Sequence, residues 1–302
     1  MTRLTANVWL MPFAVPLVCG VLLTACTRQG DESTRQTDHA STAMFTESEA
    51  YEQFMGRWSR TLGAPFVEFA NVRSGDAVLD VGSGTGALAA AVLAATDSGR
   101  LVGIDPSTAY VEYARTRTKS DRATFDVGDG QQLPFAAAEF DKALSLLVVN
   151  FIPDPAKAVR EMIRVTKPGG IVAAAVWDYG EGMEMLRVFW DEAVALEPAN
   201  ESRDERHMPL CRPGELAALW REQGLVDVLE VPLVIELRFE SFDDFWSPFL
   251  RGQGPAGAYV ASLSETARQT LRERIRKRLT AANRPFQMTA RAWAVKGEVP
   301  SR

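Results

Sequence analysis

Short apolar runs and amphipathic stretches alternate along the middle of the chain. The apolar runs predict buried strands at residues 78–81, 100–104, 123–127, 140–148 and 171–177. Helical patterns follow at residues 87–95, 107–119 and 155–165, and a Lys-Pro-Gly-Gly break at 167–170 ends the last of them. Strands that alternate with helices at this spacing form a parallel sheet covered on both faces. We therefore expect an α/β fold with a doubly wound, Rossmann-like sheet.

The flanking segments carry further patterns. Upstream, a helix is predicted at residues 47–71, where Tyr51, Phe54, Met55, Trp58 and Leu62 recur at spacings of three and four. Downstream, helices are predicted at 183–196, 214–223 and 265–278, and strands at 225–239 and 289–295. The aromatic side chains at 242–249 favour a hydrophobic helix packed on the sheet over the lining of a substrate pocket. The arginines of 265–278 are interleaved with acids, which favours a solvated face over a nucleic-acid site.

The stretch 78–86, VLDVGSGTG, has the form of a strand, a glycine turn and a helix start. Gly82, Gly84 and Gly86 remove the side chains that would keep a ligand away from the backbone. The free amides of the following helix favour a polar or anionic group, and Asp80 adds a carboxylate just before the turn. We expect a nucleotide site here; the alternative is a turn that only lets the helix pack on the strand.

Acidic side chains follow the next two predicted strands. Asp105 ends the second strand, where a carboxylate can accept two hydrogen bonds from a ribose diol. Asp129 follows the third strand and could accept a hydrogen bond from the exocyclic amine of adenine. Ligands of such sheets bind at the carboxyl ends of the strands, and all these groups fall on that edge.

The composition of the chain excludes several kinds of site. The chain has 302 residues, 46% of them hydrophobic, which allows a large buried core. Its net charge of -6 gives no general attraction to nucleic acid. The three cysteines have no metal or redox spacing, so no metal site is expected, and the two histidines, His39 and His207, exclude a histidine cluster.

Residues 1–26 are typical of a signal segment rather than of a fold. An apolar run ends in Leu23, Thr24, Ala25 and Cys26, which resembles the lipobox of bacterial lipoproteins. Residues 27–43 are polar and predict a disordered tether. Alternatively, translation starts at Met44, directly before the globular pattern, and the segment is an early-start artefact.

In these motifs the chain resembles the class I S-adenosylmethionine-dependent methyltransferases, of the bacterial kind called type 11. The resemblance rests on LDVGSGTG, VGIDPS, GDGQQLPF, FDKALSLLVVNFIPDP and RVTKPGG, which occur in order and at family-like spacing. It implies a mostly parallel sheet with an antiparallel last strand. It places the cosubstrate-binding core at residues 44–178, and substrate-side insertions with the closing strands of the same sheet at residues 179–302.

The resemblance also implies which residues hold the cosubstrate, S-adenosylmethionine. The glycine loop takes the methionine part, the acid after the second strand takes the ribose, and the acid after the third strand approaches the adenine amine. The implied contacts are Asp80, Gly82, Ser83, Gly84 and Gly86; Asp105, Pro106 and Ser107; Asp129 and Gly130; and Ser145 and Leu146. Tyr51 and Arg57, just upstream of the glycine strand, lie where a lid would sit.

Two other functions remain open at this stage. The first is an NAD(P)-dependent oxidoreductase, because Gly82, Gly84 and Ala87 also satisfy the dinucleotide pattern. Asp80, the acid after the third strand and the TKPGG segment favour the methyltransferase, and no proton-donor pair typical of a dehydrogenase is evident. The second is an envelope-anchored binding protein that reuses the methyltransferase fold.

Methyl transfer from a sulfonium requires alignment rather than a nucleophilic residue. The aromatic faces of Tyr51, Trp58 or Trp177 could favour the cationic sulfonium. Asn150 and His207 are the weak candidates for a catalytic role, and the sequence does not choose among oxygen, nitrogen and carbon acceptors. We expect a small-molecule acceptor, no nucleic acid, and a membrane only if Cys26 is lipidated. The cytosolic supply of the cosubstrate favours a start at Met44 and a cytoplasmic enzyme.

Overall fold

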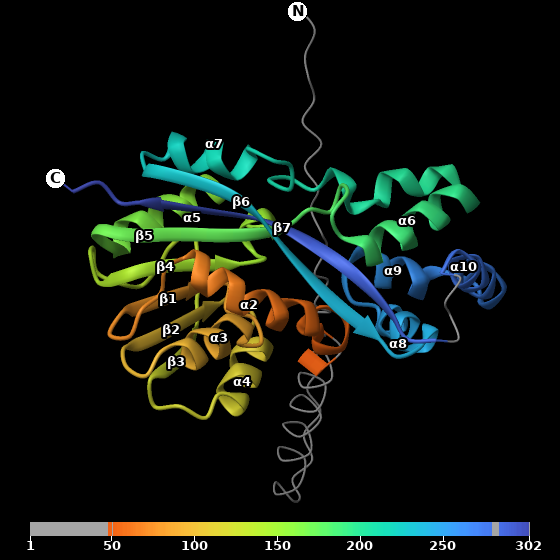
Figure 1. The fold of residues 1–302 in the computed structure, drawn as a ribbon, viewed down its shortest axis with the longest axis horizontal. Coiled ribbons are helices and arrows are strands. Elements are labelled where there is room, and N and C mark those ends of the chain that lie inside the picture. Colours follow the sequence, from red (N-terminus) through yellow and green to blue (C-terminus); the bar gives the residue numbers. More distant parts are fainter. Residues whose placement is uncertain (1–47, 50, 280–283, 302) are drawn as a thin grey trace, which may run out of the picture. The chain divides into compact units, whose positions relative to one another are not determined.

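The computed structural model describes residues 48–49, 51–279 and 284–301. The signal-like segment, the polar tether and Met44 therefore lie outside the described residues. A single seven-stranded sheet with the order β3-β2-β1-β4-β5-β7-β6 organises the described part (Figure 1). The first five strands pair in parallel, whereas β7 runs antiparallel to both β5 and β6. The predicted doubly wound α/β sheet is confirmed.

The strands follow the predicted apolar runs closely. Their bounds are β1 Ala77–Val81, β2 Arg100–Asp105, β3 Ala123–Val127, β4 Phe140–Leu146, β5 Thr166–Trp177, β6 Val226–Phe239 and β7 Phe286–Glu298. The clearest difference is β5, which begins directly after the preceding helix instead of at Ile171. A register irregularity between Phe140 and Lys142 accommodates the Lys-Pro-Gly-Gly segment, so the predicted break is a bulge inside the strand.

Helices cover both faces of the sheet. The main ones are α2 Arg57–Phe69, α3 Ala87–Ala95, α4 Thr108–Arg117, α5 Pro155–Val165, α6 Glu184–Leu196, α7 Glu215–Glu222, α8 Phe242–Trp246, α9 Gly254–Ser262 and α10 Glu265–Arg278. Lys296 on β7 reaches α2, where its Nζ donates to the carbonyl of Phe69 at 2.8 Å. The next residue, Gly297, faces Trp220 of α7. Because successive strand residues point to opposite faces, α2 and α7 lie on opposite sides of the sheet.

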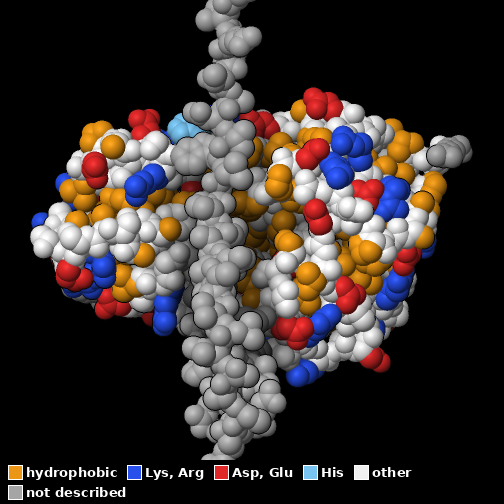
Figure 2. Space-filling view, turned by 180° about the vertical axis from the view of Figure 1, so that it is seen from behind, with side chains coloured by type: hydrophobic (Ala, Val, Ile, Leu, Met, Phe, Trp, Pro, Cys, Tyr) orange, Lys and Arg blue, Asp and Glu red, His pale blue; other side chains and the backbone are white. Residues whose placement is uncertain are grey.

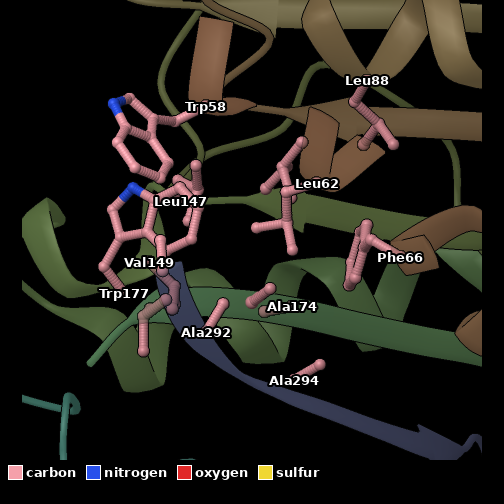
Figure 3. Packing of buried hydrophobic residues seen from close by; sticks show 14 of the residues in the cluster. Trp58, Leu62, Phe66, Leu88, Leu147, Val149, Ala174, Trp177, Ala292 and Ala294 are labelled. Atoms are coloured by element: carbon pink, nitrogen blue, oxygen red, sulfur yellow. The ribbon is translucent and has the colours of Figure 1, made fainter. Parts of the chain in front are cut away.

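Below α2 lies a buried apolar layer. Figure 3 shows Trp58, Leu62 and Phe66 of α2 directed toward the small side chains of β5 and β7, among them Ala292 and Ala294. These side chains are 0% exposed. Alanines on the strands let the large α2 side chains approach the sheet, and this interdigitation holds α2 against it.

The aromatic segment after β6 is part of the core. Phe242, Phe245 and Trp246 of α8 and Phe249 of η5 (Ser247–Arg251) are all buried. Phe249 stacks on Phe189 of α6 with ring centroids 4.6 Å apart. The prediction of a hydrophobic helix rather than a pocket lining is therefore confirmed, because these rings bury one another.

The arginine-rich helix α10 is held by ion pairs. Arg274 and Arg278 contact Glu192 and Asp191 of α6 at 2.8 and 2.9 Å, and Arg272 contacts Asp243 of α8 at 2.7 Å. Positive and negative side chains are interspersed over the face seen in Figure 2. These ion pairs agree with the prediction of a solvated helix face. Within the described ranges, no helix is long and apolar enough to cross a membrane.

Candidate functional site

The glycine turn joins β1 to α3 at the carboxyl edge of the sheet. Gly82, Gly84 and Gly86 have φ angles of +78°, +51° and +92°, in the left-handed region that favours glycine. The amides of Gly82 and Ser83 both donate to the carbonyl of Ile104 at 2.7 and 3.0 Å, which ties the turn to β2. The turn therefore has a fixed shape before any ligand binds.

Gly82 is the tightest position of this turn. A Cβ there would stand 2.4 Å from Cγ1 of Val148, whereas a Cβ at Gly84 would meet nothing within 4 Å. We expect Gly82→Ala to lower the free energy of unfolding by about 3 kcal/mol or more, since backbone strain and overpacking add. Gly84→Ala, the matched control, should cost about 1 kcal/mol from strain alone. Urea unfolding of both variants measures the difference; equal losses would contradict the packing argument.

Asp105, the last residue of β2, faces the glycine turn and is 7% exposed. Its Oδ2 accepts from the amide of Gly84 at 2.9 Å, and its Oδ1 accepts from the amide of Ser107 at 2.8 Å. A carboxylate oxygen has two lone pairs, so each oxygen keeps one for a ligand. The carboxylate is thus oriented by two backbone amides, those of Gly84 and Ser107, and can accept two further hydrogen bonds.

A pocket of about 230 Å³ opens between the glycine turn and the N-terminal helical segment. On one side it is closed by Tyr51, whose ring packs against Tyr110 of α4 with centroids 5.4 Å apart. Its lining comprises Tyr51, Ser59, Asp80, Gly82, Ser83, Gly84, Thr85, Ala87, Leu88, Asp105, Pro106, Tyr110, Leu146, Leu147, Val148 and Phe151. The pocket therefore combines two carboxyl groups with aromatic and aliphatic walls.

Asp80 is the unusual member of this lining. Its side chain is 0% exposed, and neither carboxyl oxygen has a hydrogen-bond partner. Burial, and to a lesser degree the nearby Asp105, raise the pKa of Asp80 to about 8. Burial also raises the pKa of Asp105, against the two amide hydrogen bonds. Two carboxyl groups in the lining of one pocket form a site that favours a cation.

The π-helix η1 (Glu52–Gly56) is tied to the glycine turn. The hydroxyl of Thr85 donates to the Glu52 carboxylate, which also pairs with Arg60 of α2. Burial raises the pKa of Tyr51, which directly precedes η1. Sequence reasoning assigned no site role to Glu52 or Tyr110. Tyr110 lies three residues after Ser107, the N-cap residue of α4. This spacing could have indicated from the sequence that its ring lies near the site.

The structure brings eight of the fourteen expected contacts together in the pocket. These are Tyr51, Asp80, Gly82, Ser83, Gly84, Asp105, Pro106 and Leu146. Ser107 is not part of the lining but supports it: its hydroxyl caps α4, and its amide donates to Asp105. Ser145 is buried, and its hydroxyl has no partner.

Other expected residues lie outside the lining. Asp129 is exposed, and its Oδ1 accepts from the amide of Gln131 at 2.8 Å. Gly130 packs against Val81, and Gly86 lies at the start of α3. Arg57 pairs with Asp244 at 3.0 Å and so joins α2 to α8.

The two weak catalytic candidates differ. Asn150 lies in η2 (Val149–Phe151) directly after β4 and is 6% exposed. Both polar atoms of its amide lack a hydrogen-bond partner. His207, at the end of η4 (Glu205–His207), is exposed to solvent. Asn150 is therefore the one placed to meet a buried ligand.

Comparison with known proteins agrees with this geometry. Residues 79–174 match a family model described as a methyltransferase domain. Methyltransferase GfsG of Streptomyces halstedii is 31% identical over 168 residues, which are 52% of this chain and 60% of that protein. Sterol 24-C-methyltransferase of Pneumocystis carinii is 30% identical over 137 residues, 44% of this chain and 35% of that protein. The chain thus spans 60% or less of the length of these relatives.

Solved structures share the fold. Phosphoethanolamine N-methyltransferase 2 of Haemonchus contortus, in complex with S-adenosyl-L-methionine, superimposes with a TM-score of 0.54 at 20% identity, covering 88% of this chain and 59% of that one. The cyclase SpnF superimposes with a TM-score of 0.50 at 20% identity, covering 80% and 82%. The second similarity shows that this fold also occurs in a protein named for a different reaction, so the fold alone does not decide the activity.

Proposed function

We propose that this chain, whose residues 79–174 match a model of a methyltransferase domain, transfers a methyl group from S-adenosylmethionine to a small-molecule acceptor. The observation that carries the proposal is the pair Asp80 and Asp105 in one pocket. S-adenosylmethionine has both a cationic methionine end and a ribose diol. A pocket with one unpartnered carboxyl and one oriented carboxylate fits both groups.

Each lining group has a part in this proposal. Asp105 accepts from the two ribose hydroxyls with the lone pairs that its backbone contacts leave free. Asp80 faces the cationic methionine end, and the open space at Gly84 allows close approach to the backbone. Tyr51 and Tyr110 supply aromatic walls that a cation can approach. Asp129 and Gly130 would meet the adenine amine only if the base extends beyond the described pocket along the edge of the sheet.

The same pocket disfavours the oxidoreductase alternative. A nicotinamide dinucleotide would bring its anionic pyrophosphate to the glycine turn. Here Asp80 lies beside that turn, and its pKa is raised mainly by burial and further by the negative charge of Asp105. Anion binding would increase this repulsion, whereas a cationic ligand relieves it.

The protein's task in the proposed reaction is alignment. The cosubstrate supplies a methyl group already activated by the sulfonium, so no residue needs to form a covalent intermediate. Holding donor and acceptor in contact supplies a large part of the rate, with effective molarities on the order of 10⁵ M or more. The wall formed by Leu146, Leu147 and Val148 excludes water from the methyl group.

The proposal includes a cytoplasmic location, where S-adenosylmethionine is available. The alternative is that the protein is a lipoprotein anchored to a membrane through Cys26. Labelling of cells with radioactive palmitate distinguishes the two, with Cys26→Ser as the control. We expect no label; a label that depends on Cys26 would overturn the cytoplasmic assignment.

Titration calorimetry of the purified chain with S-adenosylmethionine and with NAD tests the proposed cosubstrate. We expect saturable binding of S-adenosylmethionine at one site, and no binding of NAD at the same concentrations. S-adenosylhomocysteine, which lacks the positive charge on sulfur, should compete for the same site. Binding of NAD alone would overturn the proposed function.

A further inference from the structure

A second group of buried polar atoms lies next to the pocket and remains unexplained by the cosubstrate. The indole nitrogens of Trp58 and Trp177 and both amide atoms of Asn150 lack hydrogen-bond partners among the described residues. The three side chains are 0%, 2% and 6% exposed. A buried donor without a partner costs about 1–3 kcal/mol, so three such side chains at one edge of a sheet require an explanation.

The three residues come from three different elements that meet at the carboxyl edge. Trp58 lies on α2, Trp177 ends β5 and Asn150 follows β4. Figure 3 shows the two indoles one above the other, with their nitrogens on the same side. Unpartnered donors from three distant parts of the chain thus lie at one edge of the sheet, which is more typical of a binding site than of a packed core.

The group adjoins the proposed cosubstrate pocket without being part of its lining. Trp58 immediately precedes the lining residue Ser59, and Asn150 immediately precedes the lining residue Phe151. β5 is joined to the β4 end of the pocket, because the amide of Leu147 donates to the carbonyl of Ala175 at 2.8 Å. A molecule held by this group would therefore lie beside the methionine end of the cosubstrate.

The donor set selects the chemistry of that molecule. An indole N–H can only donate, so Trp58 and Trp177 require an acceptor atom and offer nothing to an ammonium group. The neighbouring side chains Leu147 and Val149 are buried and apolar. An apolar molecule with a hydroxyl that ionises to an oxyanion satisfies both conditions, because N–H donors in a dry site stabilise negative oxygen strongly.

We propose that the methyl acceptor is a phenol or an enol whose oxygen is held by the indole N–H groups of Trp58 and Trp177 and by the amide of Asn150. This inference rests on the proposed methyl transfer. The hydroxyl releases its proton to solvent on binding. The acceptor oxygen, or the enol carbon conjugated to it, then forms a bond to the methyl carbon while the methyl–sulfur bond breaks. The electron pair of that bond stays on sulfur, giving S-adenosylhomocysteine and the methylated acceptor.

The test uses 4-nitrophenol as the probe and the full chain saturated with S-adenosylhomocysteine. The phenolate form absorbs visible light, so a titration reports both binding and the pKa of the bound phenol. We expect saturable binding with the phenol pKa lowered by about one unit or more. Trp58→Phe and Trp177→Phe should each weaken binding roughly tenfold and return the pKa toward its free value, since each removes one donor to the oxyanion. Benzylamine, an amine probe of similar size, should not bind.

Trp293→Phe is the matched control. The indole nitrogen of Trp293 also lacks a partner, but Trp293 pairs with Val176, whereas Trp177 pairs with Ala292. Cross-strand partners share a face, so Trp293 lies on the opposite side of the sheet from Trp177. The same chemical change there should leave phenol binding unchanged, and thermal melts of all variants report whether each has folded.

Three results would overturn the inference: no saturable binding of 4-nitrophenol, tighter binding of benzylamine, or an equal loss in Trp293→Phe. If one tryptophan variant fails to fold, the pKa of the bound phenol in the unmodified chain and the other variant still decide. Titration of the same samples with S-adenosylmethionine distinguishes a wrong acceptor class from a wrong proposal of methyl transfer. Cosubstrate binding without phenol binding refutes the acceptor class alone, whereas loss of both refutes the methyl transfer as well.

Discussion

Replacement of Asp105 by Ala is expected to weaken S-adenosylmethionine binding by about 100-fold. The carboxylate would accept two hydrogen bonds from the ribose diol, and hydrogen bonds to a charged group contribute about 1.5–3 kcal/mol each. Asp105 also accepts from the amides of Gly84 and Ser107, so the variant loosens the glycine turn. Titration calorimetry measures the affinity, and circular dichroism verifies that the sheet is intact.

The ribose contact is isolated by changing the ligand as well as the protein. An S-adenosylhomocysteine analogue without the two ribose hydroxyls should bind the unmodified chain weakly and lose little more in Asp105→Ala. Asp121→Asn, an exposed acid before β3, is the control and should bind normally. An equal loss with both ligands would show that Asp105 only supports the turn.

Replacement of Asp80 by Asn is expected to stabilise the ligand-free protein at high pH. The folded protein holds the Asp80 proton up to a pKa of about 8, against an ordinary value of 3.8. Between these values the folded state binds more protons than the unfolded state, so the Asp80 contribution to stability falls as the pH rises. Asparagine has no proton to lose. The variant should therefore gain in melting temperature over the unmodified chain as the pH rises from 4 to 8, by 2–4 °C for each ~1 kcal/mol.

The same replacement is expected to reduce the affinity for S-adenosylmethionine by at least tenfold. A cation next to Asp80 favours the ionised carboxylate, so binding at pH 7 should release about one proton from this group. Asparagine can neither ionise nor pair with the cation. Calorimetry in buffers of different ionisation enthalpy measures the proton release, which should disappear in the variant. Unchanged proton release would contradict the assignment of the methionine end to Asp80.

Glu205 provides a control, because its pKa is also raised but its side chain lies outside the pocket. It is buried, its Oε2 accepts from Nε1 of Trp190 at 2.7 Å, and burial raises its pKa to about 7. Its contribution to stability is also lost as the pH rises, in the window from 4.5 to about 7. Glu205→Gln keeps an acceptor for Trp190 and should raise the melting temperature at pH 8. Because Glu205 does not line the pocket, cosubstrate affinity and proton release should stay unchanged.

The sequence by itself determined the parallel part of the sheet and the place of its ligand edge. Apolar runs flanked by glycine and proline identify buried parallel strands, because such strands are covered on both faces. The predicted strand at 123–127 and the helix at 155–165 have the bounds that the structure shows. The sequence also located Asp105 at this edge, because Asp105 is the last residue of a predicted strand and the carboxyl ends of parallel strands lie at one edge of the sheet.

The strand predicted at 171–177 begins earlier in the structure, at Thr166, for a local reason. Pro168, Gly169 and Gly170 usually interrupt an element, but the pairing of Phe140 with Thr166 continues the ladder past them. Whether such residues break a strand or form a bulge depends on the neighbouring strand. Sequence periodicity contains no information about that partner.

Only the tertiary structure decided the state of the side chains at the site. The pKa of Asp80 is raised to about 8 because the fold buries this carboxyl group without a partner. Arg57 pairs with Asp244, 187 positions away, instead of facing the pocket. The fold also buries the indole N–H groups of Trp58 on α2 and Trp177 on β5 without a hydrogen-bond partner. Charge state and hydrogen bonding depend on groups that are distant in the chain, whereas strand and helix formation depends largely on near neighbours. For this physical reason the sequence located the ligand-binding edge of the sheet, and the tertiary structure decided the chemistry of that edge.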